Sequence, residues 1–292
     1  MKKFLYKIGR VYIKIHASKQ IQIPETMKIF QVKEENGIVP SMTYEIELVD
    51  DILVKEKELL ADKVNGIEVK RDTLYLVQTT EGECRRLNFE GDPLPYAMTL
   101  RKKDNTTHVW FRSYYAKWLI YETIFVSALG LEKVMIDAES LILHSAYMNY
   151  KDTAVLFSAP SGTGKSTQAN LWEKYRGTYT VNGDKSLLIR ENGGWYAYGW
   201  PICGSSEICH NEIYPVRCIV MLKQAKENKV YPLKGFQAIR ELMEQITINS
   251  WDRDFQMKAM DQLDLLLSEI PVYKLECDIS EDAVRCLEEL IG

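Results

Sequence analysis

Apolar and polar residues alternate with a period of two along much of the first 113 residues. The run from Met42 to Leu48 places an apolar side chain at every second position, and residues 6–15 and 107–111 show the same alternation. This period is typical of β-strands that bury one face. The pattern therefore predicts an N-terminal antiparallel β-rich domain over residues 1–113.

After that region the apolar spacing changes, and helices alternate with strands. Apolar residues recur at helical spacing from Trp118 to Leu129, and Gly130 favours a helix C-terminus, so a bridging helix is predicted over residues 114–130. The pattern then predicts strands at 141–146, 153–158, 195–200, 216–222 and 272–277, and a strand, a turn and a second strand within 178–189. It predicts helices at 164–175, 236–246, 255–270 and 283–291. This order predicts an α/β (α+β) fold for a second domain, residues 114–292.

The segment from Ala159 to Thr167, with the sequence APSGTGKST, lies between a predicted strand and a predicted helix. It matches the phosphate-loop (P-loop) pattern G-x-x-x-x-G-K-[ST], except that Ala159 stands at the first Gly. In such a loop, backbone N–H groups converge on phosphate oxygens, Lys165 reaches the β- and γ-phosphates, and the Ser166 hydroxyl binds Mg²⁺. The predicted nucleotide-binding residues are Ser161, Gly162, Thr163, Gly164, Lys165, Ser166 and Thr167.

Two further polar residues are predicted to lie near this loop. Asp184, in the sequence Asn-Gly-Asp-Lys, follows the loop by about twenty residues at a turn or strand end, where it suits a second Mg²⁺ ligand. The same four residues would also form a hairpin turn. His144 lies on the predicted strand that precedes the P-loop strand, so two neighbouring strands deliver the histidine and the loop.

Charge and hydropathy exclude several classes of partner. The 292-residue chain carries a net charge of -4 at pH 7, which gives no long-range attraction to nucleic acid or to an anionic membrane. Its first residues lack the uninterrupted apolar core of a signal peptide, and the apolar stretch from Trp118 to Leu131 is too short to span a bilayer. We therefore expect a cytoplasmic protein.

The cysteines do not suggest a disulfide framework or a zinc site. There are six of them, and no two form a C-x-x-C pair. Cys203, Cys209 and His210 lie close together in the sequence, but their spacing matches no standard zinc pattern. Reduced thiols without a structural metal are expected.

The strand with His144, the loop 159–167 and the segment 182–188 together resemble the kinase domain of HPr kinase/phosphorylase. That family shares its nucleotide fold with phosphoenolpyruvate carboxykinase, and the resemblance covers residues 141–222. It implies a domain that binds ATP and Mg²⁺ and transfers a phosphoryl group to a hydroxyl. The residues that it implies are Lys165, Asp184 and His144 for catalysis, and Ser166 and Asp184 for the metal.

Three departures from that family bear on the mechanism. Thr167 stands where the family usually has Glu, Gly183 replaces the first residue of its Asp-Asp pair, and the region near Glu207 lacks its Arg- and Gly-rich substrate loop. If Asp184 binds Mg²⁺, His144 is the first candidate for the base, because the pKa of histidine lies near neutrality. A structural histidine bonded to backbone is the alternative.

The sequence thus predicts an ATP- and Mg²⁺-dependent kinase whose acceptor is a Ser or Thr of a protein or peptide. HPr itself is not the expected acceptor, because the substrate loop differs. Two alternatives remain open: a nucleotide-dependent binding or regulatory module that transfers no phosphate, and a small-molecule kinase. A homo-oligomer is compatible with this type of fold.

Overall fold

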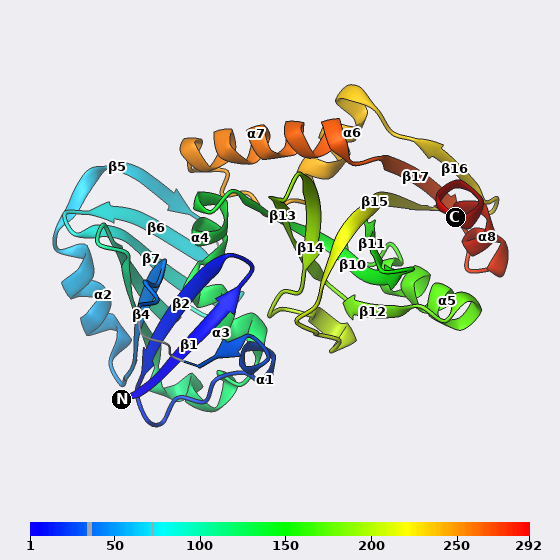
Figure 1. Ribbon diagram of the computed structural model, residues 1–292. Coiled ribbons are helices and arrows are strands. Elements are labelled where there is room, and N and C mark those ends of the chain that lie inside the picture. The colour runs from blue at the N-terminus through cyan, green and yellow to red at the C-terminus, as the bar shows by residue number, and fades with distance from the viewer. Residues whose placement is uncertain (34–36, 72) are drawn as a thin grey trace. The chain divides into compact units, whose positions relative to one another are not determined.

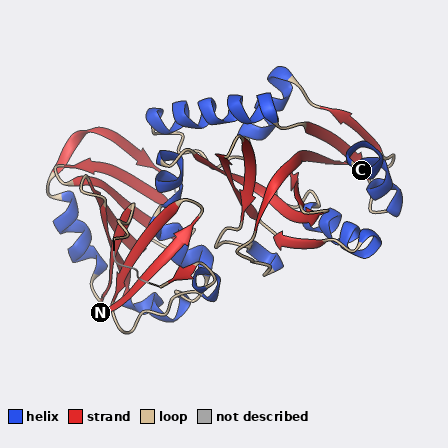
Figure 2. Ribbon diagram, in the orientation of Figure 1, coloured by secondary structure: helices blue, strands red, loops and turns tan. Residues whose placement is uncertain are grey.

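The computed structural model describes residues 1–33, 37–71 and 73–292 and divides into two compact units, Met1–Val134 and Met135–Gly292. Each unit combines a β-sheet with helices, so the fold is a mixed α/β fold (Figures 1 and 2). Across the described residues, no helix is both long enough and apolar enough to cross a membrane.

The first unit forms, over its described residues, a nine-stranded sheet in the order β3-β1-β2-β4-β9-β8-β7-β6-β5. Its strands are β1 (Lys2–Ile8), β2 (Val11–Ala17), β3 (Gln31–Val32), β4 (Met42–Val49), β5 (Lys63–Lys70), β6 (Leu74–Thr79), β7 (Gly82–Asn88), β8 (Pro95–Lys102) and β9 (Thr106–Arg112). Its helices are α1 (Glu25–Lys28), α2 (Ile52–Leu60), the 3₁₀ helix η1 (Ser113–Trp118) and α3 (Glu122–Leu129), followed by α4 (Leu131–Asp137), which contains the boundary between the units.

This sheet is mixed, and the prediction of a purely antiparallel sheet was wrong. β4 is an interior strand and pairs in parallel with both of its neighbours, β2 and β9. Parallel partners need long connections, and the segments that join these strands are long enough to hold α1, α2 and further strands. One-sided burial gives the same alternation in both kinds of sheet, so periodicity does not distinguish them.

The segment 114–130 differs from the predicted bridging helix in form and in placement. It comprises η1 and α3 and belongs to the first compact unit, whereas the predicted boundary placed it in the second domain. The reason is apolar packing, because Phe125 is fully buried and its ring stacks on Phe111 of β9 at a centroid distance of 5.9 Å. Gly130 ends α3 in the left-handed conformation, as its position predicted.

The second unit contains the following strands and helices. The strands are β10 (Ser140–Tyr150), β11 (Thr153–Ser158), β12 (Tyr179–Asn182), β13 (Lys185–Glu191), β14 (Gly194–Tyr198), β15 (Ile213–Gln224), β16 (Lys229–Pro232) and β17 (Val272–Cys277). The helices are α5 (Lys165–Arg176), the 3₁₀ helix η2 (Gly204–Ser206), α6 (Gly235–Met243), α7 (Arg253–Glu269) and α8 (Glu281–Ile291). The four longer helices confirm those predicted from apolar periodicity.

Five strands of this unit close into a ring. β10, β13, β14 and β15 pair in succession, and β11 pairs with both β10 and β15. The two long strands make this possible, because each pairs along successive parts of its length with different neighbours. β17 and β16 extend the sheet beyond β15.

Helices cover both faces of the second sheet (Figure 1). Along β10, Ala146 and Met148 belong to a core with α5 and α8, whereas Leu143 and Tyr147 belong to a core with α6 and α7. This alternation follows from the period of two, which sends successive side chains to opposite faces. Trp172 of α5 is fully buried in the first of these cores.

We expect Trp172→Ala to lower the free energy of unfolding of the second unit by about 3–5 kcal/mol, the usual cost of removing a buried Trp side chain. The ring of Trp172 packs edge-on against Tyr150 at 5.0 Å and lies 6.5 Å from Phe157, so truncation leaves a cavity in the core. Denaturant titration measures the change. Phe236→Ala is the control, because that side chain is 78% exposed and its loss should cost less than about 0.5 kcal/mol. Equal effects for the two variants would contradict the assignment of Trp172 to the core.

Candidate functional site

The site is built where β10 exchanges its partners. His144 pairs with Lys185 at the start of β13, and the next residue, Ser145, pairs with Ser158 at the end of β11. On the other side of Ser158 the chain leaves the sheet and enters the loop that precedes α5. His144 therefore lies beside both the start of β13 and the origin of the loop.

Asp184 lies in a short interruption between two strands that follow the same edge of β10. Tyr147 pairs with Asn182 of β12, and His144 pairs with Lys185 of β13, so both strands run in the same direction. The main chain of Asp184 also bonds to β10, because its carbonyl accepts from the Ser145 N–H at 2.9 Å. The alternative interpretation of this segment as a hairpin turn was therefore wrong.

The side chain of Asn182 holds this interruption in place by hydrogen bonds. Its side-chain oxygen accepts hydrogen bonds from the N–H groups of Asp184 and Lys185, both at 2.9 Å. Its amide nitrogen donates to the carbonyls of Trp200 and Ile202, at 2.7 and 3.2 Å. Because Asn182 is fully buried, these four bonds tie the strand interruption to the loop that follows β14.

The Asp184 carboxylate contacts two basic side chains. Its Oδ1 lies 3.4 Å from Nε2 of His144, and its Oδ2 lies 2.6 Å from Nζ of Lys185. Burial raises the pKa of Asp184, but the hydrogen bonds of His144 and Lys185 outweigh it and hold that pKa well below its usual range. Asp184 is therefore ionised at neutral pH.

Lys185 was not among the predicted site residues. The sequence contained a signal for it, since Lys185 follows Asp184 directly. Lys185 also begins the strand β13 and pairs there with His144. That signal depends on the strand register, which one sequence does not reveal.

Two glycines of the loop before α5, the predicted phosphate loop, have left-handed backbone conformations. Gly162 and Gly164 have φ values of 78° and 113°, which favour glycine, and Gly164 is the N-cap of α5. Gln224 of β15 steadies the loop by donating from Nε2 to the Thr163 carbonyl at 3.2 Å. Residue 159 is not among the positive-φ positions of the described chain, so Ala159 fits in place of the first motif Gly without backbone strain.

The predicted loop residues divide into exposed and buried groups. Ser161, Gly162, Ser166 and Thr167 are exposed at the mouth of the loop, whereas Thr163 and Gly164 are half-buried. Lys165 is buried, and its Nζ donates to the Ala159 carbonyl at 3.1 Å. The N-terminal end of α5, with its free N–H groups and positive dipole end, therefore opens on an exposed loop that suits an anion.

Lys165 is electrostatically coupled to the Asp184 cluster. Burial lowers the pKa of Lys165, the Asp184 carboxylate opposes that effect, and the nearby Lys185 ammonium adds to it. The structure thus brings the catalytic residues predicted from the sequence, Lys165, Asp184 and His144, into one electrostatic environment.

The segment 203–206, which contains Gly204, packs directly on Asp184. Gly204 has a φ of 60°, and a Cβ built there would lie 3.1–3.2 Å from the side chain of Asp184. A Cβ at Gly183 would likewise overlap Ser206, whose hydroxyl bonds to the Cys203 carbonyl at 2.7 Å. The segment 203–206 therefore forms one wall beside the carboxylate.

The donors of the site fit Mg²⁺ bound together with phosphate. Mg²⁺ prefers oxygen ligands and commonly takes only one or two from protein, with phosphate oxygens and water as the rest. The Ser166 hydroxyl and the Asp184 carboxylate are oxygens of this kind, but Lys185 competes for Oδ2 of Asp184. Within the described residues, no group of three or more His, Cys, Asp and Glu side chains is arranged to hold a metal ion by protein ligands alone.

Comparison with known proteins places the chain in a family. A family model described as SynChlorMet cassette protein ScmC matches residues 123–291, which is more than half of the chain and includes His144, the loop and Asp184. The chain belongs to this family. No curated protein matches it.

One solved structure with detectable similarity is the Hpr(Ser) kinase/phosphatase from Coxiella burnetii. The match has 14% sequence identity and covers 52% of this chain and 99% of that chain, with a TM-score of 0.30. Agreement at that level is too low to transfer a fold or an activity.

We expect Asn182→Ala to lower the free energy of unfolding by about 2–4 kcal/mol, because it removes both acceptor and donor from buried backbone partners. Thermal or urea unfolding of the purified variant measures the loss. Asn170→Ala, at an exposed position of α5, is the matched control and should leave stability nearly unchanged. Comparable stability of the Asn182 variant and wild type would show that these bonds do not hold the interruption in place.

Proposed function

We propose that this protein is an ATP- and Mg²⁺-dependent kinase that transfers a phosphoryl group to a hydroxyl, with a Ser or Thr of a protein or peptide as the acceptor. The observation that supports this proposal is the meeting of a phosphate-loop backbone and Lys165 with the Asp184 carboxylate and His144. Phosphoryl transfer needs little covalent chemistry from the protein and depends on positioning and charge neutralisation, which these groups supply.

The loop and Lys165 bind the donor in this proposal. Backbone N–H groups of residues 161–167 and the positive end of α5 contact phosphate oxygens. Lys165 moves its ammonium from the Ala159 carbonyl to the phosphates, exchanging a neutral acceptor for an anionic one. Ser166 and Asp184 would hold Mg²⁺, which when bound supplies neutralisation of the phosphate charge.

His144 accepts the proton of the attacking hydroxyl. With its Nε2–H directed to Asp184, the imidazole keeps a lone pair on Nδ1, and the imidazolium that forms is stabilised by the ionised carboxylate. The hydroxyl oxygen then forms the new O–P bond while the bond to the nucleoside diphosphate breaks. The backbone of His144 is held for this role by its N–H bond to the Gln245 carbonyl and by the Ser158 hydroxyl, at 2.9 and 2.8 Å.

We expect Lys165→Ala to weaken ATP binding by about ten- to a hundredfold, the range that corresponds to losing one charge-assisted hydrogen bond. Calorimetry with ATP and Mg²⁺ measures the affinity. Lys174→Ala, which removes an exposed lysine from the same helix, should bind ATP as wild type does. Equal ATP affinity of the two variants would contradict the assignment of this loop to the nucleotide site.

We expect Asp184→Asn to reduce phosphoryl transfer by about a hundredfold or more, since the neutral amide can neither orient and stabilise a charged His144 nor act as an anionic metal ligand. Mass spectrometry of candidate acceptor peptides after incubation with ATP and Mg²⁺ measures the transfer. Asp261→Asn, at an exposed position of α7, is the control.

The same assay distinguishes the alternatives. ATP binding by wild type without any modified peptide would favour a nucleotide-dependent binding module. Label that appears on small hydroxyl compounds instead of peptides would favour a small-molecule kinase.

A further inference from the structure

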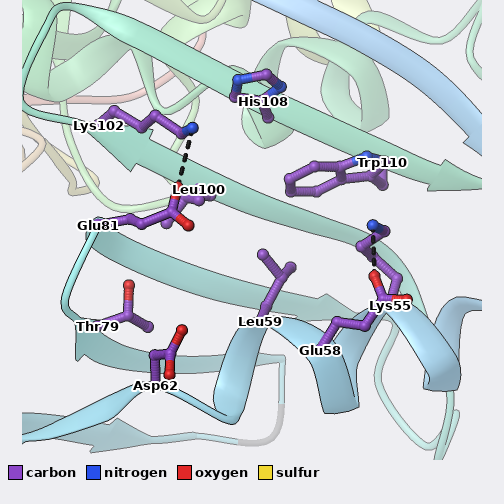
Figure 3. A pocket seen from close by; sticks show the side chains of 10 residues that line it. All are labelled: Lys55, Glu58, Leu59, Asp62, Thr79, Glu81, Leu100, Lys102, His108 and Trp110. Carbon is purple, nitrogen blue, oxygen red and sulfur yellow. Dashed lines mark hydrogen bonds and ion pairs between the residues drawn. The ribbon is translucent and has the colours of Figure 1, made fainter.

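The first unit contains a cavity of about 250 Å³ beside α2 (Figure 3). Helix α2 packs over β7, β8 and β9, but with nine residues it covers only part of that sheet face. The cavity lies where the cover ends, with Leu59 of the helix and Leu100 of β8 among its apolar lining. Its volume falls below the ~300–1,000 Å³ of typical sites for drug-sized ligands, so it suits one side chain or a small molecule.

Aromatic rings form one wall of this cavity. His108 and Trp110 of β9 lie almost parallel, with ring centroids 5.5 Å apart and an interplanar angle of 12°. The Nζ of Lys55 lies 5.0 Å from the centroid of the Trp110 ring, which shows that this wall already attracts one cation of the chain itself.

The charges around the cavity favour a further cation. Three carboxylates line it, those of Glu58, Asp62 and Glu81, against two ammonium groups. Both ammonium groups are paired: Lys55 with Glu58 at 2.7 Å, and Lys102 with Glu81 at 2.9 Å (Figure 3). No ion pair of Asp62 occurs among the described residues, so this pairing leaves one carboxylate in excess.

The end of α2 strengthens this negative character. Asp62 follows the C-cap residue Ala61 directly, so it lies at the C-terminal end of the helix. Helix C-termini carry partial negative charge and favour cations. The end of the helix and the Asp62 carboxylate therefore both favour a cation in the cavity.

Other ligand classes fit this cavity less well. An anion would meet an excess of carboxylates and two lysines that are already paired, and a purely apolar ligand would have to remove those charges from water. A bare metal is disfavoured, because the described acids do not converge as a group of three. A flat cation on an aliphatic chain fits best, since it can stack on an aromatic ring, place methylenes on Leu59 and Leu100, and bind a carboxylate.

We propose that this cavity is a binding site for a guanidinium group on a short aliphatic chain, as in an arginine side chain of a peptide or in a free alkylguanidine, with Asp62 as its carboxylate partner. The site belongs entirely to the first unit and does not depend on the proposed kinase activity. It gives this unit a recognition role for a basic ligand.

The test uses the full chain and three probes: Nα-acetyl-L-arginine amide, n-butylguanidine, and the neutral isostere Nα-acetyl-L-citrulline amide. Titration is followed by calorimetry and by the NMR signal of the Trp110 indole N–H. We expect a guanidinium probe to bind and to shift that signal, and the citrulline probe to bind at least about fivefold more weakly, because it lacks the charge. Tighter binding of acetyl-arginine amide than of n-butylguanidine, which carries the same single charge, would identify a peptide side chain as the ligand, and the reverse order a free alkylguanidine.

Asp62→Asn should weaken binding of the guanidinium probes by about three- to fivefold, the upper range for an exposed ion pair. Glu90→Gln is the matched control, because it neutralises another exposed acid of the same unit that does not line the cavity. Circular dichroism confirms that both variants fold. The proposal is overturned if neither guanidinium probe binds, if citrulline amide binds as tightly, or if Asp62→Asn binds like wild type.

Discussion

The candidate site depends on the pairing of β10 with several partners along its eleven residues. One edge of this strand pairs with β12 and β13 on either side of a two-residue interruption, and the other edge pairs with β11 over its second half. The interruption carries Asp184, and the end of β11 leads into the phosphate-loop segment. Main-chain hydrogen bonds on both edges of β10 therefore fix the positions of Asp184, His144 and the loop origin relative to one another.

That arrangement explains why small residues surround Asp184. A carboxylate held in a strand interruption must be enclosed closely enough to keep its geometry. Gly183 allows the Ser206 side chain to pack on its own backbone, and Gly204 allows the segment 203–206 to pack on Asp184. Asn182 then satisfies the backbone groups that the interruption leaves without strand partners. Packing and hydrogen bonding therefore both fix the position of the Asp184 side chain.

Much of this could be predicted from the sequence, because the relevant signals are local. The order of strand, glycine-rich loop and helix, the helices of the second unit and the Gly130 C-cap all follow from spacing within a few residues. The parallel pairing of β4 and the contact of Lys185 with Asp184 depend on register between distant strands. Short α2 was also missed, although Asp51 caps it through the N–H groups of Leu53 and Val54.

The candidate site places more basic than acidic side chains around Asp184. Lys165 lies near Lys185, and the Asp184 carboxylate is the acidic group that acts on Lys165 and pairs with Lys185. Burial of Lys165 beside a second lysine is unfavourable, as the lowered pKa of Lys165 indicates, and the carboxylate offsets only part of that cost. An anion bound at the N-terminus of α5 would pair with the excess positive charge and relieve this cost. In the function proposed above, folding would thus gather the two lysines beside the phosphates before the nucleotide binds.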